Sequence, residues 1–184
     1  MLKTVTRVLV PLAQGCEELE AVTIIDLLRR AEINVTTAGL DEKPVVASRK
    51  TVLIPDTDLD TALNDEYDMI VLPGGLPGAD HLEKDKRIKD TLVKMANANK
   101  YIAAICAAPK VLMKAGILEY KTATSYPGFL DEATNTQLSN DAVVVDDKVI
   151  TSRGPGTAMD FVLTLIESLE GKEKRDEVEK GLVK

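Results

Sequence analysis

The chain has 184 residues, 45% of them hydrophobic and 29% charged, which is typical of a globular protein with one sizeable core. Its formal net charge of −7 argues against a basic surface of the kind that binds nucleic acid. No apolar run approaches the roughly 20 residues that a membrane-spanning helix needs. We therefore expect a single domain over residues 1–184 that binds neither nucleic acid nor a membrane.

Two cysteines and one histidine restrict the chemistry further. In the absence of a signal peptide, Cys16 and Cys106 favour reduced thiols over a disulfide framework. The lone histidine is His81, and no spacing of Cys, His, Asp or Glu matches a structural zinc site. We therefore expect a cytoplasmic protein that holds no metal.

Short β-branched runs alternate with longer amphipathic runs along the chain. In the first half we predict a strand at 6–12, a helix at 17–31, a strand at 34–40, a hairpin or extended pair at 45–56 and a strand at 68–73. There follow a polar helix to about residue 99, a strand at 101–105, a helix to about residue 115, a hairpin at 142–152 turning at 146–148, and two final helices. This alternation predicts a mostly parallel sheet sandwiched between two layers of helices.

The carboxyl ends of parallel strands are where such sheets bind ligands. Four segments follow predicted strands, namely PLAQGCEELE, LPGGLPG, AICAAP and TSRGPGT. Glycines in these segments would let the backbone come close to a ligand, although for any one segment alone a tight connection is the favoured interpretation. We therefore expect any chemistry to lie in these four segments.

The segment 104–108 has the spacing of a nucleophile elbow. Alanines stand two residues before and two residues after Cys106, where the G-x-S-x-G motif has glycines, because a sharp strand-to-helix turn has no room for larger side chains. Pro109 suits the first turn of the following helix. A buried packing cysteine explains the same spacing equally well. Cys16, in a loop before a helix, is interpreted as structural.

Two consequences would follow from an elbow at Cys106. The helix N-terminus would favour the thiolate and lower the pKa of Cys106 below the free value of about 8.5. Backbone N–H groups near Ala107, with Gly75 approaching from the PGG loop, would stabilise an oxyanion.

The first predicted helix carries a carboxyl group on its apolar side. At 100° per residue, its apolar arc consists of Ala21, Ile24, Ile25, Leu27 and Leu28. Glu20 and Glu17 project within this arc. Burial would raise the pKa of Glu20, and the protonated carboxyl could then hydrogen-bond a thiolate and exchange protons with a substrate. The alternative, that glutamates complement the positive end of the helix, suits Glu17 better than Glu20.

Together, GCEELEAVTIIDLLRRA, VLPGGLPGA, AAICAAP and TSRGPGTAMDF resemble the ThiJ/PfpI superfamily over essentially the whole chain. The nearest branch is that of the parkinsonism-associated protein deglycase and the bacterial YajL-like proteins. The resemblance implies a flavodoxin-like three-layer α/β sandwich, a homodimer and no cofactor.

The resemblance also implies roles for individual residues. Cys106 matches the reactive cysteine, and Glu20 matches the protonated glutamate that hydrogen-bonds it. Gly75 and Ala107 match the backbone donors around the thiolate. Basic positions near the site or the dimer interface are matched by Arg49 and Arg30.

One position departs from the family pattern. Many relatives have a histidine where this chain has Tyr126, so a Cys–His hydrolase pair is poorly supported. Tyr126 would orient a substrate oxygen or form a wall of the pocket.

Two functions fit these residues. The first is cofactor-free, cysteine-dependent detoxification of α-oxoaldehydes such as methylglyoxal and glyoxal, and of their early glycation adducts, of the glyoxalase III or deglycase type. The second is a redox-sensing stress-response protein or chaperone that uses oxidation of Cys106 without turnover. A third, an amidotransferase-like hydrolase, needs the missing histidine. Repeated turnover distinguishes the first from the second.

Overall fold

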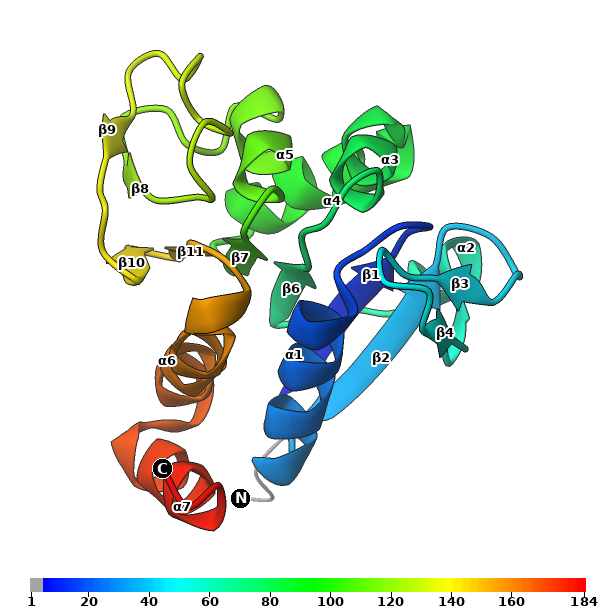
Figure 1. The fold of residues 1–184 in the computed structure, drawn as a ribbon, viewed down its shortest axis with the longest axis vertical. Coiled ribbons are helices and arrows are strands. Elements are labelled where there is room, and N and C mark those ends of the chain that lie inside the picture. Colours follow the sequence, from blue (N-terminus) through cyan, green and yellow to red (C-terminus); the bar gives the residue numbers. More distant parts are fainter. Residues whose placement is uncertain (1–4) are drawn as a thin grey trace.

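The computed structural model describes residues 5–184 and contains a seven-stranded sheet in the order β10-β11-β7-β6-β1-β2-β5 (Figure 1). Its strands are β1 (Arg7–Leu12), β2 (Asn34–Gly39), β5 (Thr57–Asp58), β6 (Met69–Leu72), β7 (Tyr101–Ile105), β10 (Val143–Asp146) and β11 (Val149–Ser152). Within the described residues, β10 runs antiparallel to β11 and the other neighbouring strands of this sheet pair in parallel. The predicted mostly parallel, flavodoxin-like sheet is confirmed.

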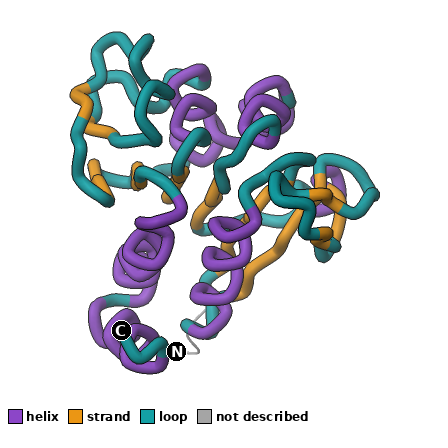
Figure 2. Tube along the Cα trace, viewed as in Figure 1, coloured by secondary structure: helices purple, strands orange, loops and turns teal. Residues whose placement is uncertain are grey.

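Helices cover both faces of the sheet (Figure 2). One face packs against α1 (Glu18–Arg30), α6 (Ala158–Glu170) and α7 (Lys172–Gly181). The other face packs against α2 (Leu59–Ala62), α3 (Gly78–Lys84), α4 (Lys86–Asn97) and α5 (Pro109–Lys114).

Each central strand contributes side chains to two hydrophobic cores, one on each face of the sheet, because successive side chains point to opposite faces. In β1, Val8 and Val10 belong to the core under α1 and α6, whereas Leu9 belongs to the core under α4 and α5. In β7, Ala103 belongs to the first of these cores and Ile102 to the second. A strand buried on both faces reads as a continuous apolar run, which is why these strands were predictable.

The predicted boundaries hold at the first helix and fail after the PGG loop. Glu17 caps α1, since its side chain accepts a hydrogen bond from the backbone N–H of Glu20. The single helix predicted up to residue 99 is wrong, because Asp85 separates α3 from α4. Its carboxylate accepts the backbone N–H of Arg87 and thereby starts a new helix.

Smaller elements complete the fold. The predicted hairpin at 45–56 is present as β3 (Val45–Val46) and β4 (Val52–Leu53), which form a separate two-stranded sheet. The short elements β5, α2, β8 (Thr122–Ala123) and β9 (Gln137–Leu138) were not predicted, because two to four residues carry too little periodicity. Across residues 5–184, no helix is long and apolar enough to cross a bilayer.

A pair of neighbouring residues on α4 tests the core assignment. Leu92 is fully buried and Val93 is 37% exposed. We expect Leu92→Ala to lower the free energy of unfolding by about 2–5 kcal/mol, because it leaves a cavity under the sheet. Val93→Ala, the matched control, should change it by no more than about 0.5 kcal/mol. Urea denaturation measures both, and equal losses would contradict the packing.

Candidate active site

Cys106 occupies a sharp turn between β7 and α5. Its φ of +64° lies in the left-handed region, which is uncommon for a residue with a side chain and concentrates at functional sites. Two hydrogen bonds fix this conformation. The N–H of Cys106 donates to the carbonyl oxygen of Ser152 at 3.0 Å, and its carbonyl oxygen accepts the N–H of Tyr126 at 2.8 Å. The structure therefore has the strand-to-helix turn that the sequence indicated.

Two glycines after β6 bring the backbone against Cys106. A Cβ on Gly74 would lie 2.7 Å from the Cβ of Cys106 and 2.8 Å from Oε2 of Glu20. Gly75 has a φ of +88°, and a Cβ there would lie 2.4 Å from the backbone nitrogen of Glu17. The N–H groups of Gly75 and Ala107 lie close to Cys106 and favour its thiolate, which lowers its pKa. The predicted backbone donors thus meet at the sulfur.

Glu20 is fully buried at the start of α1, beside the same turn. Its Oε2 accepts the N–H of Gly74 at 2.8 Å. Oε1 is also buried and has no well-aligned hydrogen-bond partner in the described chain, while the carboxyl group interacts with the thiol of Cys106. Burial raises the pKa of Glu20 to about 7, and the contacts with Gly74 and Cys106 oppose this rise only in part.

The pKa of Cys106 shifts in the direction opposite to the prediction. Burial, the negative charge of an ionised Glu20 and the hydrogen bond between the two groups raise the pKa of Cys106 to about 12. The expectation of a lowered pKa was wrong, because burial and then the charge of Glu20 outweigh the favourable N–H groups of Gly75 and Ala107. The two groups therefore do not both ionise near neutral pH, and the charge of an ionised Glu20 opposes formation of the thiolate.

The remaining predicted residues divide between the site and the surface. Tyr126 lies at the site through its backbone bond to Cys106. Arg49 is exposed, and only its backbone is held, by the carboxylate of Glu18 at 2.8 Å. Arg30 does not lie beside Cys106. Ten residues along α1 place it about 15 Å from Glu20, and it is exposed and paired with Asp26 at 2.7 Å.

The structure also places residues that sequence reasoning did not single out for the site. Ser152 holds the backbone of Cys106, and only the pairing of β11 with β7 brings it there. Glu18 anchors the loop between β3 and β4 by accepting hydrogen bonds from Ser48 and Arg49. Desolvation opposes ionisation of Glu18, yet these donors lower its pKa to about 2. The repeated glutamates at the helix start were the available signal for this anchor.

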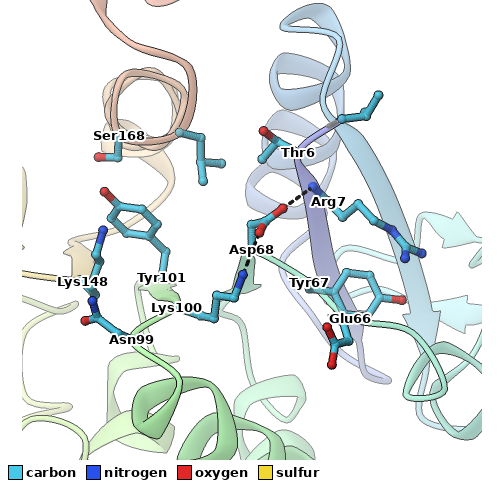
Figure 3. Close-up of a pocket in the computed structure, with 12 residues that line it drawn as sticks. Thr6, Arg7, Glu66, Tyr67, Asp68, Asn99, Lys100, Tyr101, Lys148 and Ser168 are labelled. Carbon is cyan, nitrogen blue, oxygen red and sulfur yellow. Dashed lines mark hydrogen bonds and ion pairs between the residues drawn. The ribbon is translucent and has the colours of Figure 1, made fainter. Parts of the chain in front are cut away.

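A sizeable cavity lies elsewhere. It measures about 600 Å³ and is lined by residues at the opposite, amino ends of the strands, including Arg7, Asp68 and Tyr101 (Figure 3). Asp68 accepts hydrogen bonds there from the backbone of Arg7 and from Lys100. None of the residues around Cys106 lines it. In the described part of the chain, no three His, Cys, Asp or Glu side chains are grouped to hold a metal ion.

The raised pKa of Glu20 makes stability depend on pH. The pKa rises from an ordinary value near 4.3 to about 7 in the fold, so protonation stabilises the fold fully below about pH 4. This stabilisation is lost as the pH rises through about 7. Relative to Glu20→Gln, we expect wild-type stability to fall by up to about 3 kcal/mol between pH 4 and pH 8.

Urea denaturation across this pH range measures the difference. The control is Glu18→Gln, because the lowered pKa of Glu18 acts in the opposite sense: its stabilisation is present above about pH 4 and is lost as the pH falls towards about 2. A difference between wild type and Glu20→Gln that stays constant with pH would contradict a buried, proton-binding Glu20.

Comparison with known proteins places this site in a family. Residues 6–168 match the DJ-1/PfpI family model. The chain is 45% identical to Protein dj-1beta of Drosophila melanogaster over 178 residues, covering 95% of both chains. It is 36% identical to Glutathione-independent glyoxalase DJR-1.2 of Caenorhabditis elegans, covering 92% of this chain and 91% of that protein. It is also 45% identical to Protein DJ-1 homolog B of Arabidopsis thaliana, but spans only 39% of that protein's length.

Solved structures agree with these matches. The crystal structure of Drosophila melanogaster DJ-1beta superposes with a TM-score of 0.94 at 44% identity and covers 98% of both chains. That of oxidized Toxoplasma gondii DJ-1 superposes with a TM-score of 0.93 at 38% identity, over 97% of this chain and 98% of that one. The protein therefore belongs to the DJ-1/PfpI family.

Proposed function

We propose that the protein is a cofactor-free glyoxalase that converts small α-oxoaldehydes to hydroxy acids at Cys106. The observation that carries the proposal is the buried contact between Cys106 and Glu20, where burial raises the pKa of both acidic groups. Glyoxalase chemistry needs one nucleophile and one group that both gives and takes a proton. The name of the Caenorhabditis elegans relative supports the same activity.

The first steps use both members of the pair. With the proton on Glu20, the Cys106 thiolate attacks the aldehyde carbon of methylglyoxal and forms a carbon–sulfur bond. The aldehyde oxygen becomes an alkoxide, which takes the proton of Glu20. The N–H groups of Gly75 and Ala107, which already face the sulfur, stabilise negative charge developing beside it.

The remaining steps move hydrogen within the substrate. The Glu20 carboxylate removes the proton from the former aldehyde carbon and returns it to the neighbouring carbon, and the hydroxyl proton passes to the second oxygen. One carbon is thereby oxidised to a thioester and the other reduced to an alcohol, so no external oxidant is needed. Water then hydrolyses the thioester, which releases lactate and restores Cys106.

The same proposal covers adducts and assembly. Hemithioacetals form reversibly, so removal of free aldehyde also depletes early glycation adducts, and deglycation is a finer form of the same activity.

A homodimer is supported by apolar side chains exposed on α1, where Leu19 is 51% and Val22 46% exposed. We further propose that the protein acts in the cytoplasm and that Arg49 shapes the entrance to the site.

A second function is favoured by the same contact. Oxidation of Cys106 to the sulfinic acid would place oxygens beside a protonated Glu20, which could donate a hydrogen bond to them. The protein would then act as a redox sensor or stress-response chaperone, modified once per chain instead of turning over substrate.

The decisive experiment measures lactate formed from excess methylglyoxal. We expect many turnovers per chain for the wild type and a loss of at least about a thousandfold in Cys106→Ser, which lacks a competent nucleophile. Glu20→Gln should lose about 10²–10⁴-fold, because the amide donates a hydrogen bond but moves no proton. Circular dichroism confirms that each variant is folded.

Two outcomes would contradict a glyoxalase. Consumption of at most one equivalent of methylglyoxal per chain would favour the sensor, and mass spectrometry after peroxide treatment would then locate the added oxygens. Normal turnover by Glu20→Gln would remove Glu20 from the proton transfer and refute the mechanism.

A further inference from the structure

Tyr126 contacts Cys106 through its backbone and the segment after β11 through its ring. The N–H of Tyr126 donates to the carbonyl oxygen of Cys106, and the N–H of Cys106 donates to Ser152, two residues before Gly154. The ring of Tyr126 reaches back to Gly154, where a Cβ would lie 3.4 Å from its Cδ2. The ring therefore packs against the loop that follows β11, while the backbone of the same residue is bonded to Cys106.

The order of the strands puts this ring on the side of Cys106 away from Glu20. β7, which carries Cys106 at its end, lies between β11 and β6. Gly154 follows β11 on one side, while Gly74 follows β6 and Glu20 follows β1 on the other. Glu20 and the ring of Tyr126 thus lie towards opposite sides of the strand that ends at Cys106.

The ring is fixed in place yet open to solvent. Phe129 packs edge-on against it, with ring centroids 6.1 Å apart and planes inclined at 75°. Tyr126 remains 49% exposed, so one aromatic surface is available next to the site. Aromatic pairs favour this edge-on arrangement, and it stabilises them beyond the free energy of burying apolar area.

We propose that the ring of Tyr126 binds the substituent on the keto carbon of the substrate and makes the protein selective for aryl over methyl α-oxoaldehydes. The inference rests on the proposed function. When the aldehyde carbon is bonded to the sulfur and its hydrogen faces Glu20, the substituent on the neighbouring carbon extends towards the β11 side. A flat apolar group there stacks on Tyr126, whereas a methyl group leaves most of the ring in water.

The test compares kcat/KM for phenylglyoxal with kcat/KM for methylglyoxal, in initial rates short enough to avoid modification of arginines. We expect the wild type to favour phenylglyoxal by at least about tenfold. Tyr126→Ala should lower the ratio at least about fivefold, and Tyr126→Phe, which keeps the ring, should retain it. The control Tyr120→Ala removes a side chain that is 83% exposed and should leave both rates unchanged.

A ratio that is the same in Tyr126→Ala and the wild type would overturn the inference while leaving the glyoxalase intact. If the protein shows no glyoxalase activity, the aromatic contact is tested separately by measuring binding, which needs no turnover. Calorimetry compares the affinity of Cys106→Ser for mandelate and for lactate, the products of the two substrates. Tighter binding of mandelate that disappears in the double variant with Tyr126→Ala supports the aromatic contact. Equal binding of the two products overturns it.

Discussion

The buried contact between Glu20 and Cys106 is the constraint on which the rest of the site depends. Two acidic groups in one buried location resist ionising together, so an ionised Glu20 opposes formation of a thiolate at Cys106. A helix N-terminus acting alone would favour the thiolate, which oxidants attack readily. In the proposed mechanism, the carboxyl group makes the reactivity of the sulfur depend on the proton that the reaction then uses.

The fold assembles this contact from segments that are far apart in the sequence. Parallel pairing of β1, β6, β7 and β11 brings their carboxyl ends to one edge of the sheet. Close approach then requires residues without side chains, as at Gly74, where any Cβ would collide with both Cys106 and Glu20. The glycines of the PGG loop are thus explained by the packing of the pair as much as by the binding of an oxyanion.

Much of this arrangement was predictable, and two of the three exceptions share a cause. The apolar runs of β1, β6 and β7 and the position of Glu20 on the apolar arc of α1 are local patterns, and the structure bears them out. The break at Asp85, the bond from Cys106 to Ser152 and the direction of the Cys106 pKa shift were missed. The last two depend on neighbours distant in sequence, which periodicity does not reveal.

The site holds a strained cysteine and a buried carboxyl group, and both cost stability. A left-handed residue with a side chain costs about 1–3 kcal/mol, which two apolar cores offset, since each fully buried leucine contributes about 1.5–3 kcal/mol. The turn is held through backbone groups: Tyr126 reaches Cys106 by its N–H, and any residue except proline supplies one. The side chain at position 126 is therefore free to vary without disturbing the pair, so a single scaffold can keep its nucleophile while the wall beside it changes.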